Sequence, residues 1–233
     1  MIDIETFFDG SRKIIGKGAQ ADVYSYKGYA YKVYRASYPT EWIEFEKSQQ
    51  AEVNRLGLSP VRYYDTEDPH IVKMDLIDGI PLEQKMREGY LEGFDLLARM
   101  FRKVHQADPR DVKMPHLIDT AGIGMSDEEK GKILPIIDRL SCKLESRICH
   151  LDMHFLNIML TKDEPIIIDW MNTMIAPVIF DYARTYVIFK EYAPEIIGLY
   201  QNAVASDIAD ISEEDFNDAV TVCTAIRQKE KNT

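Results

Sequence analysis

The feature that most constrains the fold is a polar loop that runs directly into two short apolar stretches. Residues 150–170 read HLDMHFLNIMLTKDEPIIIDW. The polar letters TKDE and Pro165 separate the two apolar stretches, which is typical of a β-hairpin. Antiparallel pairing of the two stretches brings Asn157, at the start of one strand, beside Asp169, at the end of the other. The chain therefore needs a fold in which a polar loop leads into such a hairpin.

The side chains of this segment allow two kinds of chemistry. Asn157 and Asp169 supply hard oxygen ligands of the kind that Mg²⁺ binds alongside substrate phosphates. Asp152 lies in the loop before Asn157, where its carboxylate could accept the proton of an attacking hydroxyl. Alternatively, His150, Asp152 and His154 could converge on one metal ion, as in a metal-dependent hydrolase.

An N-terminal segment adds a candidate phosphate site. Residues 21–34, ADVYSYKGYAYKVY, are rich in Val and Tyr and predict a hairpin that turns at Lys27-Gly28. This register sets Val23 opposite Lys32. A lysine on an otherwise apolar strand is costly to bury unless an anion neutralises it.

Glycines and a helix flank this hairpin. Gly16 and Gly18 lie at the preceding turn, where the absence of side chains lets backbone N–H groups approach phosphate oxygens. Residues 39–57 have helical character, with Thr40 as the N-cap and Gly57 as the stop. From this helix either Glu46 or Glu52 could pair with Lys32; we expect Glu46.

The chain beyond Gly79 has a helical pattern. Apolar residues in 93–106 recur at spacings of three and four, which predicts one buried helix face. Residues 126–129, SDEE, form a capping box for the next helix, which Pro135 is expected to kink or interrupt. A final helix is expected from Ser212. We find neither repeats nor a flexible linker, and we expect lobes at residues 1–77 and 78–233 with a hinge between them.

Composition limits the partners. The net charge of −11 argues against nucleic acid as the main partner and would suit a cationic ligand. No apolar run approaches the roughly 18 residues of a membrane helix, so we expect no membrane partner and a cytoplasmic location. The cysteines, Cys142, Cys149 and Cys223, have no metal-site spacing and are expected to be reduced and buried. The sequence leaves the oligomeric state open.

The order of motifs along the chain resembles that of the protein-kinase-like fold: G-x-G, V, K, a helical E, H-x-D-x(4)-N, and apolar-apolar-D. HLDMHFLNIML with IIIDW is similar to its aminoglycoside phosphotransferase and choline kinase branch. This resemblance covers roughly residues 12–190. It implies an α+β, two-lobed fold with a small antiparallel sheet and one helix in the N-terminal lobe, and a larger, mainly helical C-terminal lobe.

The resemblance also implies roles for particular residues. ATP or GTP would lie between the lobes, with Lys32 on its α and β phosphates and the backbone near residues 75–77 reading the base. Asp152 would be the catalytic base, and Asn157 and Asp169 would hold Mg²⁺. Asp181 would support the catalytic loop. The residues expected to bind the nucleotide are Gly16, Gly18, Val23, Lys32, Glu46, Asp75, Leu76 and Ile77.

The implied function is Mg-dependent transfer of the γ-phosphate to a hydroxyl of a small molecule that is aminoglycoside-, amino-sugar- or choline-like. A protein kinase is disfavoured because only a short segment, without A-P-E, separates Asp169 from Asp181. A catalytically weak nucleotide-binding scaffold stays an alternative. Departures from the family pattern, Ala21, Leu156 and APVIFD at 176–181, bear on loop shape and substrate class. Acidic residues of the tail that could attract a cationic acceptor are Asp207, Asp210, Glu213, Glu214, Asp215 and Asp218.

Overall fold

The computed structural model describes residues 4–231 and divides into two compact units. The first unit runs to Gly79 and also includes residues 161–171. The second unit contains residues 80–160 and resumes at Asn172. No helix in the described range is both long and apolar enough to cross a membrane.

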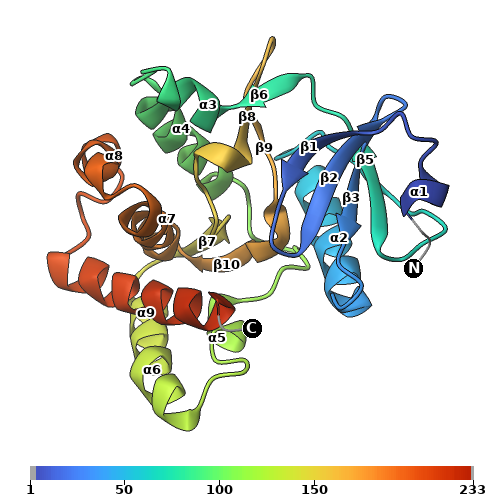
Figure 1. Ribbon diagram of the computed structural model, residues 1–233. Helices are drawn as coiled ribbons and strands as arrows, with labels where there is room; N and C mark the ends of the chain where they lie inside the picture. Colours follow the sequence, from blue (N-terminus) through green and yellow to red (C-terminus); the bar gives the residue numbers. More distant parts are fainter. Residues whose placement is uncertain (1–3, 232–233) are drawn as a thin grey trace. The chain divides into compact units, whose positions relative to one another are not determined.

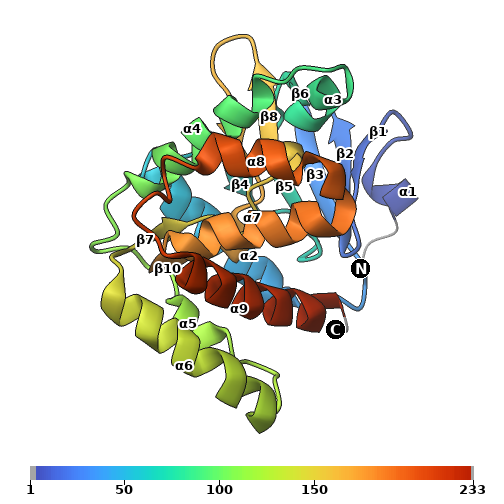
Figure 2. The same ribbon diagram turned by 90° about the vertical axis from the view of Figure 1, so that its left-hand side faces the viewer.

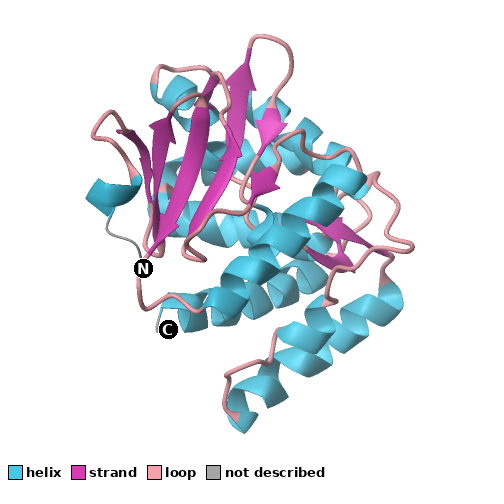
Figure 3. Ribbon diagram, turned by 90° about the vertical axis from the view of Figure 1, so that its right-hand side faces the viewer, coloured by secondary structure: helices cyan, strands magenta, loops and turns pink. Residues whose placement is uncertain are grey.

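The first unit is built on a five-stranded sheet of order β1-β2-β3-β5-β4, in which neighbouring strands are antiparallel (Figures 1 and 3). Its strands are β1 (Lys13–Lys17), β2 (Ala21–Tyr26), β3 (Tyr29–Tyr34), β4 (Tyr63–Tyr64) and β5 (Ile71–Asp75). A short helix, α1 (Ile4–Phe7), precedes the sheet. One apolar cluster joins Phe8 to Tyr31, Val33 and Ile71, and a second joins Ala30 and Val72 to Ile43 of the long helix of this unit.

The β2–β3 hairpin has the predicted register. Val23 pairs with Lys32, and Tyr26 pairs with Tyr29 across the turn. Lys27 and Gly28 both have positive φ, 45° and 80°, as a two-residue turn requires when its twist follows that of the strands. The prediction is confirmed even though Lys-Gly is not a favoured turn pair, because Gly28 takes the left-handed conformation without a steric cost.

The helix of the first unit, α2 (Thr40–Arg55), confirms the predicted helix and corrects its start. Thr40 is the first helical residue and not the cap; Pro39 takes the cap position, and no side chain caps the helix. The stop is as expected, because Gly57 has φ of 70° just past the C-cap.

Residues 161–171 belong to the first unit, whereas we expected them in the second lobe. Their contacts explain the difference. Ile166 packs against the apolar cluster of the sheet, and the Tyr38 hydroxyl lies 3.5 Å from the Met171 sulfur. Asp169 faces Lys32 of β3.

The predicted hairpin at 157–169 is present as β8 (Ile158–Thr161) and β9 (Ile166–Ile167), which are neighbours in a small sheet. Asn157 and Asp169 lie just outside these strands. They belong to different units, so their convergence on one cation stays a prediction.

The second unit is mainly helical (Figure 2). Its buried helix α4 (Gly93–His105) has the predicted apolar face, which includes Leu97, Phe101 and Val104. Helices α7 (Ile179–Tyr192) and α9 (Glu213–Lys231) lie side by side and share a core with α6 (Asp127–Lys143). The remaining elements are β6 (Gly79–Pro81), α3 (Leu82–Arg87), α5 (Leu117–Thr120), the antiparallel pair β7 (Ser146–Cys149) and β10 (Met174–Pro177), and α8 (Ile197–Val204).

Local signals in this unit have mixed outcomes. The Ser126–Glu129 capping box opens α6 as predicted, and the final helix starts beside Ser212. Pro135 lies inside α6 and does not interrupt it. Cys149 and Cys223 are buried as expected, but Cys142 is exposed because it lies on the outward face of α6.

Candidate active site

Lys32 is held between two carboxylates of the first unit. Its Nζ lies 2.6 Å from Oε1 of Glu46 and 3.4 Å from Oδ1 of Asp169. Glu52, the other candidate partner, instead pairs with Arg55 one turn along the same helix. The structure therefore selects Glu46, which faces the sheet because it lies on the buried side of α2.

The charge of Lys32 is strongly favoured in this position. Only 18% of its side chain is exposed, so burial opposes the charge, but the carboxylates of Asp169 and Glu46 more than compensate and hold its pKa well above the usual value. Glu46 is fixed in turn, because it accepts hydrogen bonds from the Tyr34 and Tyr63 hydroxyls at 2.7 and 3.3 Å. Sequence reasoning placed Tyr34 on a strand but assigned no role to either tyrosine.

Asp169 has an unusual backbone conformation. Its φ is 63°, a left-handed value that is uncommon for a residue with a side chain and is tolerated best by Asp and Asn. Trp170 follows it and is 1% exposed, and its indole N–H donates to the Ile167 carbonyl at 3.0 Å. The anchored indole holds the strained residue, so the Asp169 carboxylate points toward Lys32.

An apolar cluster of the sheet adjoins this ion cluster through Tyr34 and Tyr63, whose hydroxyls bind Glu46. Val23 and Ile77 are half-buried against the cluster that contains Ala30 and Met74, and Ile166 joins them from β9. A flat apolar base could stack on such a surface.

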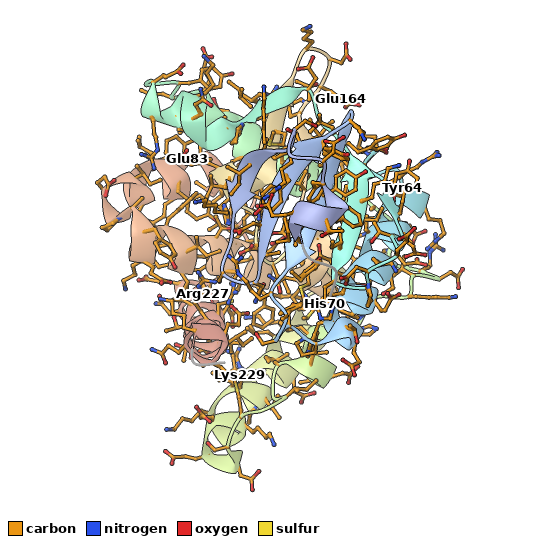
Figure 4. The ribbon with its side chains drawn as sticks, turned by 45° about the vertical axis from the view of Figure 1, so that its right-hand side comes forward. Tyr64, His70, Glu83, Glu164, Arg227 and Lys229 are labelled. Carbon is orange, nitrogen blue, oxygen red and sulfur yellow. The ribbon has the colours of Figure 1, made fainter. Side chains whose placement is uncertain are left out.

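The expected base-reading segment, residues 75–77, borders a pocket of about 330 Å³. Asp75 has a structural role there, because its carboxylate accepts the Arg62 N–H and the Tyr64 hydroxyl, both at 3.0 Å. Leu76 is exposed, and Ile77 packs against the sheet. Tyr64, labelled in Figure 4, thus ties β4 to the end of β5.

Gly16 and Gly18, the two glycines before β2, differ in position, because only Gly18 lies in the turn between β1 and β2. Gly16 lies in β1, where the pairing with β2 is irregular. The Gly18 N–H donates to the Ala21 carbonyl at 2.9 Å and closes the turn. A Cβ on Gly18 would come within 3.1 Å of that carbonyl oxygen, so the turn needs glycine for close approach of the backbone.

In the second unit, Asp181 organises the loop after β7. Its carboxylate accepts the N–H groups of His150 and Leu151 at 3.0 and 2.8 Å, and it lies 2.9 Å from Nε2 of His105 on α4. Asp181 is fully buried at the start of α7. The expected support of the loop is thus visible as three contacts from one carboxylate.

Asp152 lies in the centre of this loop. Its carboxylate accepts from the Asn157 amide at 3.1 Å and lies 3.7 Å from Nε2 of His154. Burial disfavours its charge, but His154 and His150 outweigh this effect and lower its pKa to about 2. The carboxylate is therefore ionised at neutral pH, as a proton acceptor must be.

Asn157 donates its amide to Asp152, to the backbone oxygen at 2.9 Å as well as to the carboxylate. In this orientation the amide oxygen is the atom that a cation would bind. His154 caps the short 3₁₀ turn at 155–157 by accepting the Leu156 N–H, a role that the sequence did not indicate. Leu156 itself is 53% exposed.

The metal-hydrolase alternative does not fit this geometry. Nδ1 of His150 accepts the Asp152 N–H, and Nδ1 of His154 accepts the Leu156 N–H. Among the described residues, the one group whose ligand atoms lie within 4.8 Å of one another is His105, Cys149 and Asp181, not the predicted set. The imidazoles are used to shape the loop, because each is hydrogen-bonded to the backbone.

The acidic tail is partly engaged inside the second unit. Asp215 pairs with Arg139 and Lys143, Asp218 pairs with Arg139, and Asp207 pairs with Arg102. These carboxylates link α9 and the turn after α8 to neighbouring helices. They are therefore not an open patch for a cationic ligand.

The sheet unit with its lysine–glutamate pair, and the helical unit with its polar loop, define the protein-kinase-like fold. The family model described as "Phosphotransferase enzyme family" matches residues 11–213, and the chain belongs to this family. The predictions of the fold and of a small-molecule kinase are thereby confirmed. A comparison with curated protein sequences found no match.

Solved structures share the fold at low identity. An aminoglycoside-3'-phosphotransferase of type VIII is 17% identical with a TM-score of 0.66, and 93% of each chain is covered. Choline kinase LicA from Streptococcus pneumoniae is 17% identical with a TM-score of 0.63, covering 96% of this chain and 86% of that one. Amicoumacin kinase hAmiN, solved with AMP-PNP, Ca²⁺ and Ami, is 14% identical with a TM-score of 0.58, covering 92% and 78%.

Proposed function

We propose that the protein transfers the γ-phosphate of ATP or GTP, with Mg²⁺, to a hydroxyl group of a small molecule. The observation that carries the proposal is Lys32, held charged between Glu46 and Asp169. A lysine fixed in this way binds phosphate as a point charge. The complex of amicoumacin kinase with AMP-PNP and Ca²⁺ supports a nucleotide and a divalent cation in this fold.

The nucleotide would use groups of the first unit. Lys32 binds phosphate oxygens, and the apolar surface of Val23, Ala30 and Ile77 takes the base. The backbone of residues 75–77 supplies hydrogen-bonding groups for the base, while Gly16 and Gly18 let the first turn approach the phosphates.

The second unit would supply the proton acceptor. Asp152 takes the proton of the acceptor hydroxyl while the hydroxyl oxygen bonds to the γ-phosphorus. The nucleoside diphosphate then leaves with the electrons of the broken P–O bond. Asn157 holds Asp152 in place. Asn157 and Asp169 carry the amide and carboxylate oxygens that Mg²⁺ prefers, and the bound ion would offset the charge of the phosphate oxygens.

The acceptor is a small molecule in this proposal, of the aminoglycoside, amino-sugar or choline kind. The net charge of −11 favours a cationic one through long-range attraction. The ion pairs of Asp207, Asp215 and Asp218 weaken that argument. A cytoplasmic location stays a prediction.

A thermal-shift and turnover experiment tests the proposal. ATP or GTP with Mg²⁺ should raise the melting temperature, because a ligand at 100 times its Kd stabilises the folded state by about 2.7 kcal/mol. Asp169→Ala should abolish metal-dependent nucleotide turnover, while Asp210→Ala on the exposed surface should not. The proposal would be refuted if the protein bound neither ATP nor GTP. It would also be refuted if Lys32→Met left the affinity for the nucleotide unchanged. Binding without transfer to any acceptor of a broad panel would favour the scaffold alternative.

A further inference from the structure

Arg184 differs from the other buried charged side chains of the second unit, because most of its guanidinium has no partner. The residue is 3% exposed. Nη2 donates to the Glu230 carboxylate, whereas Nε and Nη1 meet no acceptor within residues 4–231. Buried donors without acceptors cost free energy and are uncommon in folded proteins. A ligand that supplies the missing acceptors would explain them.

The position of Arg184 on α7 places it beside the catalytic loop. Asp181, Arg184 and Thr185 are spaced by three and four residues and share one face of the helix. Asp181 holds the loop at His150 and Leu151, and the Thr185 hydroxyl donates to the Met153 carbonyl at 2.6 Å. The residues on either side of Arg184 on this face therefore bracket Asp152.

Electrostatics agree with this placement. Burial raises the pKa of Asp152, while His154, His150 and then Arg184 lower it. An anion bound by Arg184 would lie on the helix whose Asp181 and Thr185 hold the loop on both sides of the proposed proton acceptor.

The present partner of Arg184 can be displaced. Glu230 lies in the last turn of α9, its side chain is 37% exposed, and it also lies 3.5 Å from Nη1 of Arg227 (Figure 4 labels Arg227). Glu230 can turn toward solvent and keep its contact with Arg227, but Arg184 is buried, so an incoming oxyanion has to replace the carboxylate on the guanidinium. Rotation of Glu230 would uncover a planar group whose donors match a carboxylate or phosphate.

We propose that Arg184 binds an oxyanion, a carboxylate or a phosphate group, beside Asp152, and that the Glu230 carboxylate takes its place in the absence of ligand. The inference rests on the proposed function, because Asp152 has to be the catalytic base for this position to matter in the reaction. The oxyanion can be an anionic group of the acceptor or the phosphoryl group in transfer. In the first case the acceptor carries an anionic group, as a hydroxy acid or a sugar phosphate does, which would replace the cationic acceptor class proposed above while keeping the transfer to a hydroxyl.

Binding of inorganic phosphate to the full chain tests the proposal. Titration calorimetry is done on Lys32→Met protein, so that the nucleotide site does not contribute. In this background, a second substitution Glu230→Gln should tighten phosphate binding. The second substitution Arg184→Gln should instead weaken phosphate binding by about tenfold or more, as expected for the loss of charge-assisted hydrogen bonds. Arg139→Gln, which removes another arginine paired with a carboxylate of α9, is the matched control and should change nothing.

Kinetics with a matched pair of acceptors, one anionic and one cationic, separate the two sources. An oxyanion on the acceptor predicts that Arg184→Lys raises KM for the anionic acceptor alone. Contact with the phosphoryl group predicts a lower kcat for every acceptor and for nucleotide hydrolysis.

Two results would overturn the proposal. One is unchanged phosphate binding when Arg184→Gln is added to the Lys32→Met protein, with circular dichroism showing that this variant is folded. The other, which decides if Arg184→Gln does not fold, is Glu230→Gln without any gain in phosphate binding. The rise in melting temperature with nucleotide, which depends on Lys32, is measured separately. If nucleotide gave no such rise, the proposed function would be refuted, but the result of the phosphate titration would still stand.

Discussion

At the scale of single residues, the candidate site is made of charges whose states are set by their neighbours. Lys32 stays charged although it is largely buried, because Glu46 and Asp169 face it. Asp152 stays ionised although it is largely buried, because two histidines lie beside it. Each charged group thus depends on partners from other parts of its unit, and replacing one partner changes the others.

Replacing Asp152 by Asn should separate catalysis from binding. The amide keeps the shape and can still contact Asn157, but it cannot accept the hydroxyl proton. We expect kcat to fall by about 10² to 10⁴, the range for a positioned general base, with nucleotide affinity nearly unchanged. Steady-state kinetics and a nucleotide titration measure the two effects. Equal turnover in the variant would assign the base to another residue.

The low pKa of Asp152 also predicts a pH dependence of stability. The carboxylate has a pKa of about 2 in the folded protein, below its ordinary value of 3.8, so its stabilising contribution is fully present above about pH 4. It is lost as the pH falls through 2. The stability advantage of the wild type over Asp152→Asn should therefore shrink from pH 4 to pH 2 in urea unfolding. Asn202→Ala, an exposed neutral change, should give a difference that does not vary with pH.

At the scale of elements, tight turns and helix ends fix where the strands and helices lie. The β2–β3 turn sets the register that brings Val23 opposite Lys32. The capping box of Ser126 and Glu129 fixes the start of α6. Turn and cap geometry depends on a few residues, so its contribution can be measured by single substitutions.

Replacing Gly28 by Ala should destabilise the first unit through the backbone alone. Gly28 has φ of 80°, and a Cβ there would meet nothing within 4 Å, so no clash contributes. The left-handed conformation costs a residue with a side chain about 1–2 kcal/mol. Gly131→Ala, in an exposed turn of α6 with open space around it, should instead stabilise by about 0.5–1 kcal/mol. Chemical denaturation gives the free energy of unfolding of both variants. If Gly28→Ala and Gly131→Ala changed it equally, the assigned turn at Gly28 would be contradicted.

At the scale of the molecule, each of the two units has its own core and its own polar cluster. The first unit surrounds Lys32, and the second is organised around Asp181, which connects α4, α7 and the loop at 150–151. A fully buried carboxylate with three partners from separate segments links the helices of this unit through one side chain. The loop that carries Asp152 and the helical core are therefore coupled.

Asp181→Ala should destabilise the second unit far more than a surface change of the same kind. It leaves two backbone N–H groups and His105 without their buried acceptor, and removal of one partner from such a cluster costs about 3–5 kcal/mol. Asp218→Ala, which removes an exposed ion pair with Arg139, should cost about 1 kcal/mol or less. Urea unfolding followed by circular dichroism compares the two. Similar losses would mean that Asp181 is not the central brace.

The sequence by itself determined the local features of this protein: the hairpin register, the helices from 40 to 55 and from 93 to 105, and the family with its fold. Turn chemistry and apolar periodicity act over a few residues, so they can be found without coordinates. Only the tertiary structure decided the choice of Glu46 over Glu52, the engagement of the acidic tail, the place of residues 161–171 and the unpartnered guanidinium of Arg184. These depend on which segments, distant in sequence, pack together, and that packing sets the burial and charge of each side chain.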